Sequence, residues 1–295
     1  MSSDRRWLQK ARELHNHHFD STVWNGFAFR PDDVVIATYA KFGTTWTPQI
    51  VGQLVFGGDP SVKVVELSPW LDLRVPEKKI KLDLLEAQTH RRFVKTHLPV
   101  DVARGGRDVM GSMHNHHVCA NDLWYRLIND TPGRVGPPIE RPRSDVRAYF
   151  LDWLDGNGYP FWPFCKNFRS WWAIRDLPNV LLLYYPDMEG DLPGWVARIA
   201  RFLDIPVDNE TMQRVLEHAS FAWMKAHADD AAPLEGVCWN GGAGDFIHEC
   251  TNGRWRDVLT SGDCDRYEQC ALAELGTECA RWLAEGARGQ SARAA

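Results

Sequence analysis

The sequence lacks any long hydrophobic run and has no pair of cysteines in a CxxC spacing. No apolar stretch in its 295 residues is long enough to cross a membrane, and the N-terminal region carries no apolar segment of the kind that directs secretion. The seven cysteines are scattered and odd in number, which favours reduced thiols. These absences predict a cytoplasmic protein that has no membrane partner.

An excess of positive charge is also missing. The 34 basic residues are outnumbered by 39 acidic residues, and the net charge of −5 argues against a nucleic-acid partner. An anionic ligand would therefore need a local basic pocket. The length and the 44% hydrophobic content suit one large α/β domain. We expect a single domain over residues 1–285 and a flexible tail over 286–295.

The most informative pattern spans residues 34–46, where an apolar, β-branched run leads into a polar loop and then an apolar segment. This order predicts a strand, a tight turn and a helix start, which stabilises anions through its free N–H groups. A Walker loop, with Gly-Lys-Ser/Thr, is absent. A buried strand followed by a capped helix is the alternative to a nucleotide-phosphate site. The loop supplies a charge, a glycine, two hydroxyls and a flat ring, from Lys41, Gly43, Thr44, Thr45 and Trp46.

A second predicted strand, over residues 92–97, also ends in polar groups. Because side chains alternate along a strand, Lys95 and His97 point to the same side. A histidine at this edge can act as a general base, since its ordinary pKa lies near working pH. A structural histidine bonded to the backbone is the alternative interpretation.

A third segment follows shortly after the second strand. Arg104 and Arg107, with Ser112 one to two helical turns later, can hold a second phosphate through guanidinium and hydroxyl contacts. Solvated arginines in a glycine turn explain the same residues equally well.

Strands and helices alternate along the chain, which predicts an α/β fold with its ligand at the carboxyl ends of parallel strands. A third strand is expected over 180–185. Residues 131–143 are predicted to form a loop, and Thr260 with Asp263 is predicted to form a capping box. The predicted helices span residues 44–56, 107–125, 146–154, 164–175, 192–203, 209–218 and 262–285.

Taken together, the three segments resemble the cytosolic-type sulfotransferases, which use 3′-phosphoadenosine 5′-phosphosulfate (PAPS) as donor. The family signature Tyr-Pro-Lys-Ser-Gly-Thr-Thr-Trp is similar to Tyr39–Trp46, and its Lys-Thr-His-Leu-Pro stands intact at Lys95–Pro99. An arginine followed eight positions later by a serine matches Arg104 and Ser112. Weaker matches occur at 181–185, 218–225 and 253–255, so the resemblance runs from about Trp24 to Trp255.

The resemblance implies a P-loop-like, three-layer α/β/α fold with a central parallel sheet. It also implies a sulfuryl transfer from PAPS to a hydroxyl or amine of a small-molecule acceptor, leaving 3′-phosphoadenosine 5′-phosphate (PAP) and requiring no metal. Lys41, Lys95 and His97 would be catalytic, with His97 as the base. The donor would contact Lys41, Gly43, Thr44, Thr45, Trp46, Arg104, Ser112, Tyr185 and Phe221.

The sequence departs from the family pattern in ways that keep two other functions open. The link from His97 to Arg104 is too short for the family's intervening strand, and Glu249 stands in a normally basic segment. Ala219 lacks a hydroxyl, and Phe42 replaces a small loop residue. A non-catalytic relative and a small-molecule P-loop kinase are therefore alternatives. The oligomeric state, monomer or homodimer, is open.

Two residue clusters, one of histidines and one of aromatic residues, each have a functional and a structural interpretation. The histidine-rich stretches 15–18 and 114–117 invite a metal site, but no completing ligand set is visible, so solvated or acceptor-pocket histidines are favoured. The aromatic residues between 153 and 172 are assigned to the core in preference to an acceptor pocket.

Overall fold

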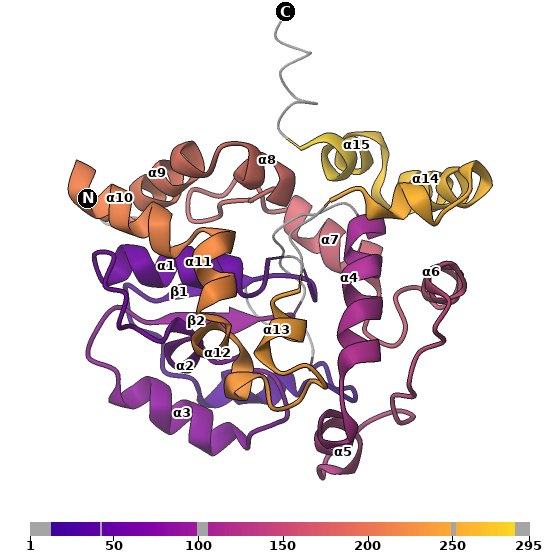
Figure 1. Ribbon diagram of the computed structural model, residues 1–295, viewed down its shortest axis with the longest axis horizontal. Coiled ribbons are helices and arrows are strands. Elements are labelled where there is room, and N and C mark those ends of the chain that lie inside the picture. The colour runs from indigo at the N-terminus through magenta and orange to yellow at the C-terminus, as the bar shows by residue number, and fades with distance from the viewer. Residues whose placement is uncertain (1–12, 42, 99–105, 249–251, 287–295) are drawn as a thin grey trace, which may run out of the picture.

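The structure is a computed structural model that describes residues 13–41, 43–98, 106–248 and 252–286 (Figure 1). Strand β1 (Val34–Ala37) pairs in parallel with β2 (Phe93–Thr96). The two predicted strands are therefore confirmed, although both are shorter than predicted. β1 ends at Ala37 instead of Tyr39, and β2 ends at Thr96 instead of His97. Parallel strands need a long crossover, and here it contains α1 (Trp46–Val55), α2 (Val64–Leu67) and α3 (Lys78–Ala87).

Helices cover both faces of the strand pair, as Figure 1 shows for α1 and α3. Phe93 and Ile36 are buried with apolar residues of α1, α9 (Leu192–Phe202) and α10 (Asn209–His218). The next residue, Val94, points to the other face and packs against Leu85 of α3. This alternation gives the layered α/β arrangement that the sequence predicted.

A larger core lies beyond the carboxyl end of β1, where α6 (Val146–Asp155), α7 (Phe164–Trp172), α14 (Ser261–Leu275) and α15 (Thr277–Glu285) pack together. The core interpretation of the aromatic residues agrees with this arrangement, since all but the partly buried Trp171 are buried there. They are Trp153, Phe161, Trp162, Phe164 and Trp172.

Two long predicted helices are each divided in the structure. The helix expected over 107–125 is α4 (Gly106–Cys119) followed by α5 (Asp122–Asp130), because the Asn121 side chain accepts N–H bonds and starts a new helix. The C-terminal helix is divided into α14 and α15 at Gly276, whose φ of 76° no helix accommodates. The predicted capping box of Thr260 and Asp263 is present.

The predicted strand over 180–185 is wrong. Residues 180–183 form no regular strand, Tyr184 makes a single bridge, and α8 (Tyr185–Gly190) begins at Tyr185. A strand needs a neighbour to satisfy its backbone. No described strand pairs with this segment, and the short link after His97 leaves few residues to form one. Leu183 is still buried with Ile36, so the apolar run contributes to the core without a ladder.

The remaining elements are short, and none of the described helices is long and apolar enough to span a membrane. The six described cysteines are free thiols. The tail over 287–295 lies outside the described residues, so the predicted domain limits stay a prediction. The short elements are η1 (Ser21–Gly26), α11 (Phe221–Ala226), α12 (Ala228–Ala231), η2 (Pro233–Gly236), α13 (Ala243–Phe246) and η3 (Arg254–Asp257).

Candidate active site

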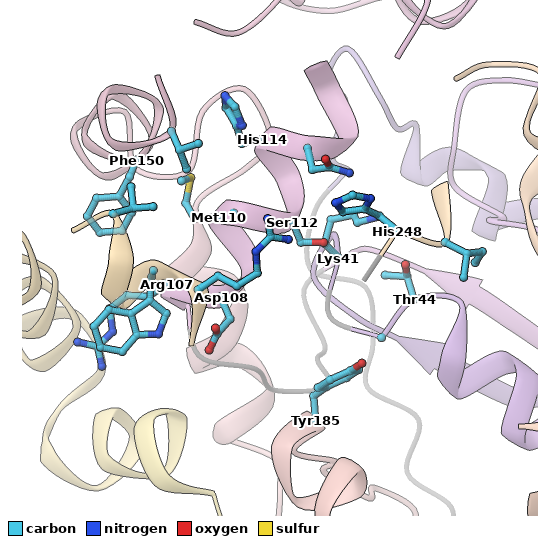
Figure 2. Close-up of a pocket in the computed structure, with 18 of the residues that line it drawn as sticks. Lys41, Thr44, Arg107, Asp108, Met110, Ser112, His114, Phe150, Tyr185 and His248 are labelled. Carbon is cyan, nitrogen blue, oxygen red and sulfur yellow. The ribbon is translucent and has the colours of Figure 1, made fainter. Parts of the chain in front are cut away.

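A cavity of about 530 Å³ lies where the loop after β1 meets α4, α8 and α11. Figure 2 shows Lys41, Thr44 and Tyr185 on one side of it and Arg107, Met110 and Phe150 on the other. Every predicted donor-binding residue that the structure describes lines this cavity. They are Lys41, Gly43, Thr44, Thr45, Trp46, Ser112, Tyr185 and Phe221.

The loop adopts a backbone that suits close approach of a ligand. Lys41 and Gly43 have positive φ values of 66° and 78°, a region that is costly for any residue with a side chain. The Thr47 N–H bonds to the Gly43 carbonyl at 2.9 Å as α1 begins. The buried Thr47 hydroxyl has no partner among the described residues. The loop thus combines a helix start, unsatisfied polar groups and a lysine, which together favour an anion.

The ring of Trp46 is fixed at the cavity wall. Its Nε1–H donates to the Ala219 carbonyl at 2.7 Å, and its centroid lies 4.9 Å from that of Tyr185. The contact uses the backbone of Ala219, so it needs no hydroxyl there. Phe221, 37% exposed, lines the same cavity. Flat faces from two elements can therefore flank a base.

Charges of both signs surround the cavity. Lys41 Nζ lies 4.9 Å from the Phe246 ring centroid. Arg107 stacks on Trp255 at 4.0 Å and pairs with Glu268 at 2.7 Å, which directs it away from the role of a phosphate ligand. The carboxylate of Asp108 accepts the Gly253 N–H at 2.5 Å. Phe42, Arg104 and Glu249, on which sequence predictions depend, lie outside the described residues.

His97 is buried behind the loop rather than on the cavity lining. Its Nδ1 lies 2.5 Å from the Thr38 carbonyl oxygen, which can only accept, so Nδ1 carries the hydrogen and Nε2 has a lone pair. Burial, together with the positive charges of Lys95 and Lys41, lowers the pKa of His97 well below its usual value. The imidazole is therefore neutral and can accept a proton at Nε2.

Lys95 and His97 lie on the same side of β2, as alternation predicted. Both contact Trp70: the Lys95 ammonium lies 5.8 Å and the His97 ring centroid 4.2 Å from the Trp70 ring centroid. Burial lowers the pKa of Lys95 to about 8, and the nearby Asp72 carboxylate opposes that shift. Lys95 is thus a charged group at neutral pH in a largely dry setting.

Most histidines of the two histidine-rich stretches are buried rather than solvated, whereas His15 is exposed and His114 lines the cavity. His17, His18, His114 and His117 are buried, and the ring of Phe161 or Tyr149 packs against each of the last three. Within the described part of the chain, one group of side chains has the spacing to hold a metal ion, and it includes a single histidine from these stretches. It consists of Glu13, His15 and Asp20 at the surface.

Sequence reasoning missed several residues of the site. Asp72 precedes β2 by a long gap, and no motif marked it. Met224, which lies within the weaker match at 218–225, also lines the cavity together with Phe246 and His248, and none of the three was among the predicted site residues. Their side chains reach the cavity through the tertiary fold, so spacing along the chain could not identify them.

Comparison with known proteins resolves which family has this loop and cavity. The model of the family described as "Sulfotransferase domain" matches residues 31–276. The chain belongs to this sulfotransferase family. It is 28% identical to a glycolipid sulfotransferase of Mycobacterium tuberculosis, over 92% of this chain and 93% of the relative. Sulfotransferase 1B1 of Canis lupus familiaris is also 28% identical, over 84% and 85% of the two chains.

Solved structures agree with the sulfotransferase fold. Mouse sulfotransferase SULT7A1 complexed with PAP is similar with a TM-score of 0.67 and 19% identity, over 93% of each chain. Retinol dehydratase in complex with androsterone and inactive cofactor PAP gives a TM-score of 0.65 and 26% identity, over 87% of this chain and 86% of that one. This sulfotransferase therefore has the α/β fold of its family over nearly all of its length.

Proposed function

We propose that this sulfotransferase uses PAPS as donor and transfers its sulfuryl group to a hydroxyl of a small-molecule acceptor. The observation that carries the proposal is the single cavity that gathers all eight described residues of the predicted donor site. The solved relatives named above hold PAP, the product that PAPS leaves behind.

The loop residues would bind the 5′-phosphosulfate. Lys41 supplies a positive charge, the Thr44 and Thr45 hydroxyls donate hydrogen bonds, and the helix start contributes its N–H groups. Ser112 would contact the 3′-phosphate together with Arg104. Trp46 and Phe221 would flank the adenine, which fits their place on the cavity wall.

Proton transfer is assigned to His97, whose Nε2 lone pair accepts the acceptor's hydroxyl proton. The donor supplies the sulfuryl group, whose bond to the phosphate oxygen breaks as the bond to the acceptor oxygen forms, so the electron pair stays on the phosphate. Lys41 and Lys95 stabilise that negative charge. Neutralisation by two lysines and the loop amides is the reason that we propose a reaction without a metal.

Glycolipids are the acceptor class that the names of the mycobacterial relatives suggest testing first, and 2-naphthol serves as a simple hydroxyl acceptor for comparison. The mycobacterial relatives are glycolipid sulfotransferases. The Trp70 and Trp162 indoles pack against His97, so aromatic surface surrounds the proposed base.

Calorimetric titration with PAP tests the donor site directly, with 5′-AMP as control. PAP should bind at least about tenfold more tightly than 5′-AMP, and Ser112→Ala should reduce that preference. Radiolabelled PAPS with 2-naphthol or a purified glycolipid then tests transfer. Binding of PAP without transfer to any acceptor would favour the non-catalytic alternative. Magnesium-dependent ATP consumption would instead indicate the kinase.

A further inference from the structure

Asp72 is a fully buried carboxylate that accepts hydrogen bonds from the Trp70 indole and from the backbone N–H of His97. It sits in the segment after Pro69, which runs along the free side of β2. The Lys95 N–H bonds to the Pro69 carbonyl at 3.2 Å, and the Leu71 N–H to the Lys95 carbonyl at 2.9 Å. Backbone pairing therefore holds Asp72 beside the carboxyl end of β2.

Four donors converge on the two oxygens of this carboxylate. Oδ1 accepts from the Trp70 indole and, at 3.4 Å, from the His97 backbone N–H. Oδ2 accepts from the Trp24 indole at 3.0 Å and from the Thr96 hydroxyl. Three of these partners can only donate, so the oxygens act as acceptors, as in an ionised carboxylate.

Trp70 links this carboxylate to the transfer site. Its ring meets that of His97 edge-on at 4.2 Å, while its N–H is held by Asp72, so the indole cannot rotate without losing that bond. The same Oδ1 also holds the backbone of His97. One side chain therefore holds both the Trp70 ring and the backbone of His97.

Asp72 also lies within electrostatic reach of two lysines. Its negative charge raises the pKa of Lys95 on β2 and of Lys81 on α3, against the burial that lowers the pKa of each to about 8. Other charged or titratable groups around Lys95 are His97 and, on α4, His116, and Lys41 lies near both of these histidines.

We propose that Asp72 is the positioning residue of the transfer site: it fixes Trp70 against His97 and provides the counter-charge that keeps Lys95 protonated. The role rests on the proposed function, but its electrostatic part can be measured without turnover. Burial raises the pKa of Asp72 itself, and the hydrogen bonds from the four donors oppose that rise only in part.

The first experiment follows the Lys95 titration by NMR of protein labelled with ¹³C-lysine, with Lys95→Arg used for assignment. Asp72→Asn should lower the Lys95 pKa by about one pH unit. Asp59→Asn, which changes an exposed carboxylate bonded to Ser61, is the matched control and should leave it unchanged. Asp72→Glu should restore the wild-type titration. An unchanged Lys95 pKa in folded Asp72→Asn overturns the electrostatic role.

A second variant keeps the proposal testable if Asp72→Asn does not fold. Trp70→Phe retains one aromatic ring and removes the indole N–H that donates to Asp72, together with part of the ring surface. With PAPS and 2-naphthol, kcat should fall at least about tenfold while PAP affinity stays at the wild-type value. Equal kcat values in Trp70→Phe and wild type would refute the positioning role. A wild type without transfer activity would count against the proposed function, and the Lys95 titration would still decide the role of Asp72.

Discussion

Acidification should destabilise this sulfotransferase through histidines that it buries in the neutral state. Burial lowers the pKa of His17 from 6.5 to about 4 and that of His117 to about 3. In the unfolded chain both imidazoles titrate near 6.5. Below that pH the unfolded state binds more protons than the folded state, so the free energy of unfolding must decrease as pH falls.

The size of the loss follows from these values. At pH 7.5 the two histidines are neutral in both states and the contribution is close to zero. At pH 5 each unfolded imidazole is protonated and each folded one is not, which costs about 2 kcal/mol per histidine at about 1.4 kcal/mol per pH unit. The decrease for His17 ends near pH 4, where the folded state also binds the proton.

Urea unfolding at several pH values between 7.5 and 5 measures this loss. His117→Gln removes one titrating group, so its free energy of unfolding should change with pH by about 2 kcal/mol less than that of the wild type. His227→Gln, at an exposed position, is the control and should follow the wild-type pH dependence. Because the comparison uses the slope with pH, a general loss of stability in either variant does not affect it.

An equal slope in His117→Gln and wild type would refute the reasoning. It would mean that His117 exchanges protons with solvent in the folded state, and therefore that the packing of its ring 5.2 Å from Phe161 is not maintained.

Three further predictions concern the loop and the sheet. Lys41→Ala should reduce the initial rate of turnover with PAPS by about 100-fold or more, whereas Lys41→Arg should retain part of that rate. Equal rates in Lys41→Ala and wild type would exclude charge stabilisation by this residue. Gly43→Ala should weaken PAP binding about fivefold in calorimetry, because its φ of 78° costs a side chain about 1 kcal/mol; unchanged affinity would mean that the loop can adopt another backbone. Asp33→Ala should lower the free energy of unfolding, measured in urea, by about 3–5 kcal/mol. The substitution removes the carboxylate that lies 2.5 Å from the buried Arg92 guanidinium. A change below about 1 kcal/mol would show that water reaches Arg92.

The parts of this site that sequence predicted are those that short segments of chain encode. The strand, loop and helix order over residues 34–46 and the alternation of Lys95 and His97 need only neighbouring residues, and both are present. Asn121 is a residue type that caps helices and marks the point where the long helix is divided, but the apolar pattern continues across it. Local periodicity alone therefore overestimated the helix.

The parts that sequence did not predict depend on contacts between distant segments. Asp72 gains its environment from Trp24 and Thr96, which are 48 and 24 positions away, so no local pattern marks it. From the sequence, the buried histidines could be recognised only as polar residues, whereas in the structure aromatic rings from distant segments pack around them. The wrong strand over 180–185 has the same origin: its residues suit a sheet, but a described partner strand is missing.

The pairing of β1 and β2 sets the relation between the proposed base and the proposed phosphate loop. Ala37 lies opposite Thr96, and the next residues are joined by the bond from the Thr38 N–H to the Thr96 carbonyl at 3.1 Å. The Thr38 carbonyl then accepts from His97 Nδ1, which fixes the tautomer, and Lys41 follows three positions later. A one-residue slip of this register would turn Lys95 and His97 to the opposite face of the sheet. The buried ion pair of Arg92 with Asp33, at the other end of the same strands, opposes such a slip. Sheet register, rather than any contact within the cavity, is therefore what brings the base strand and the phosphate loop together.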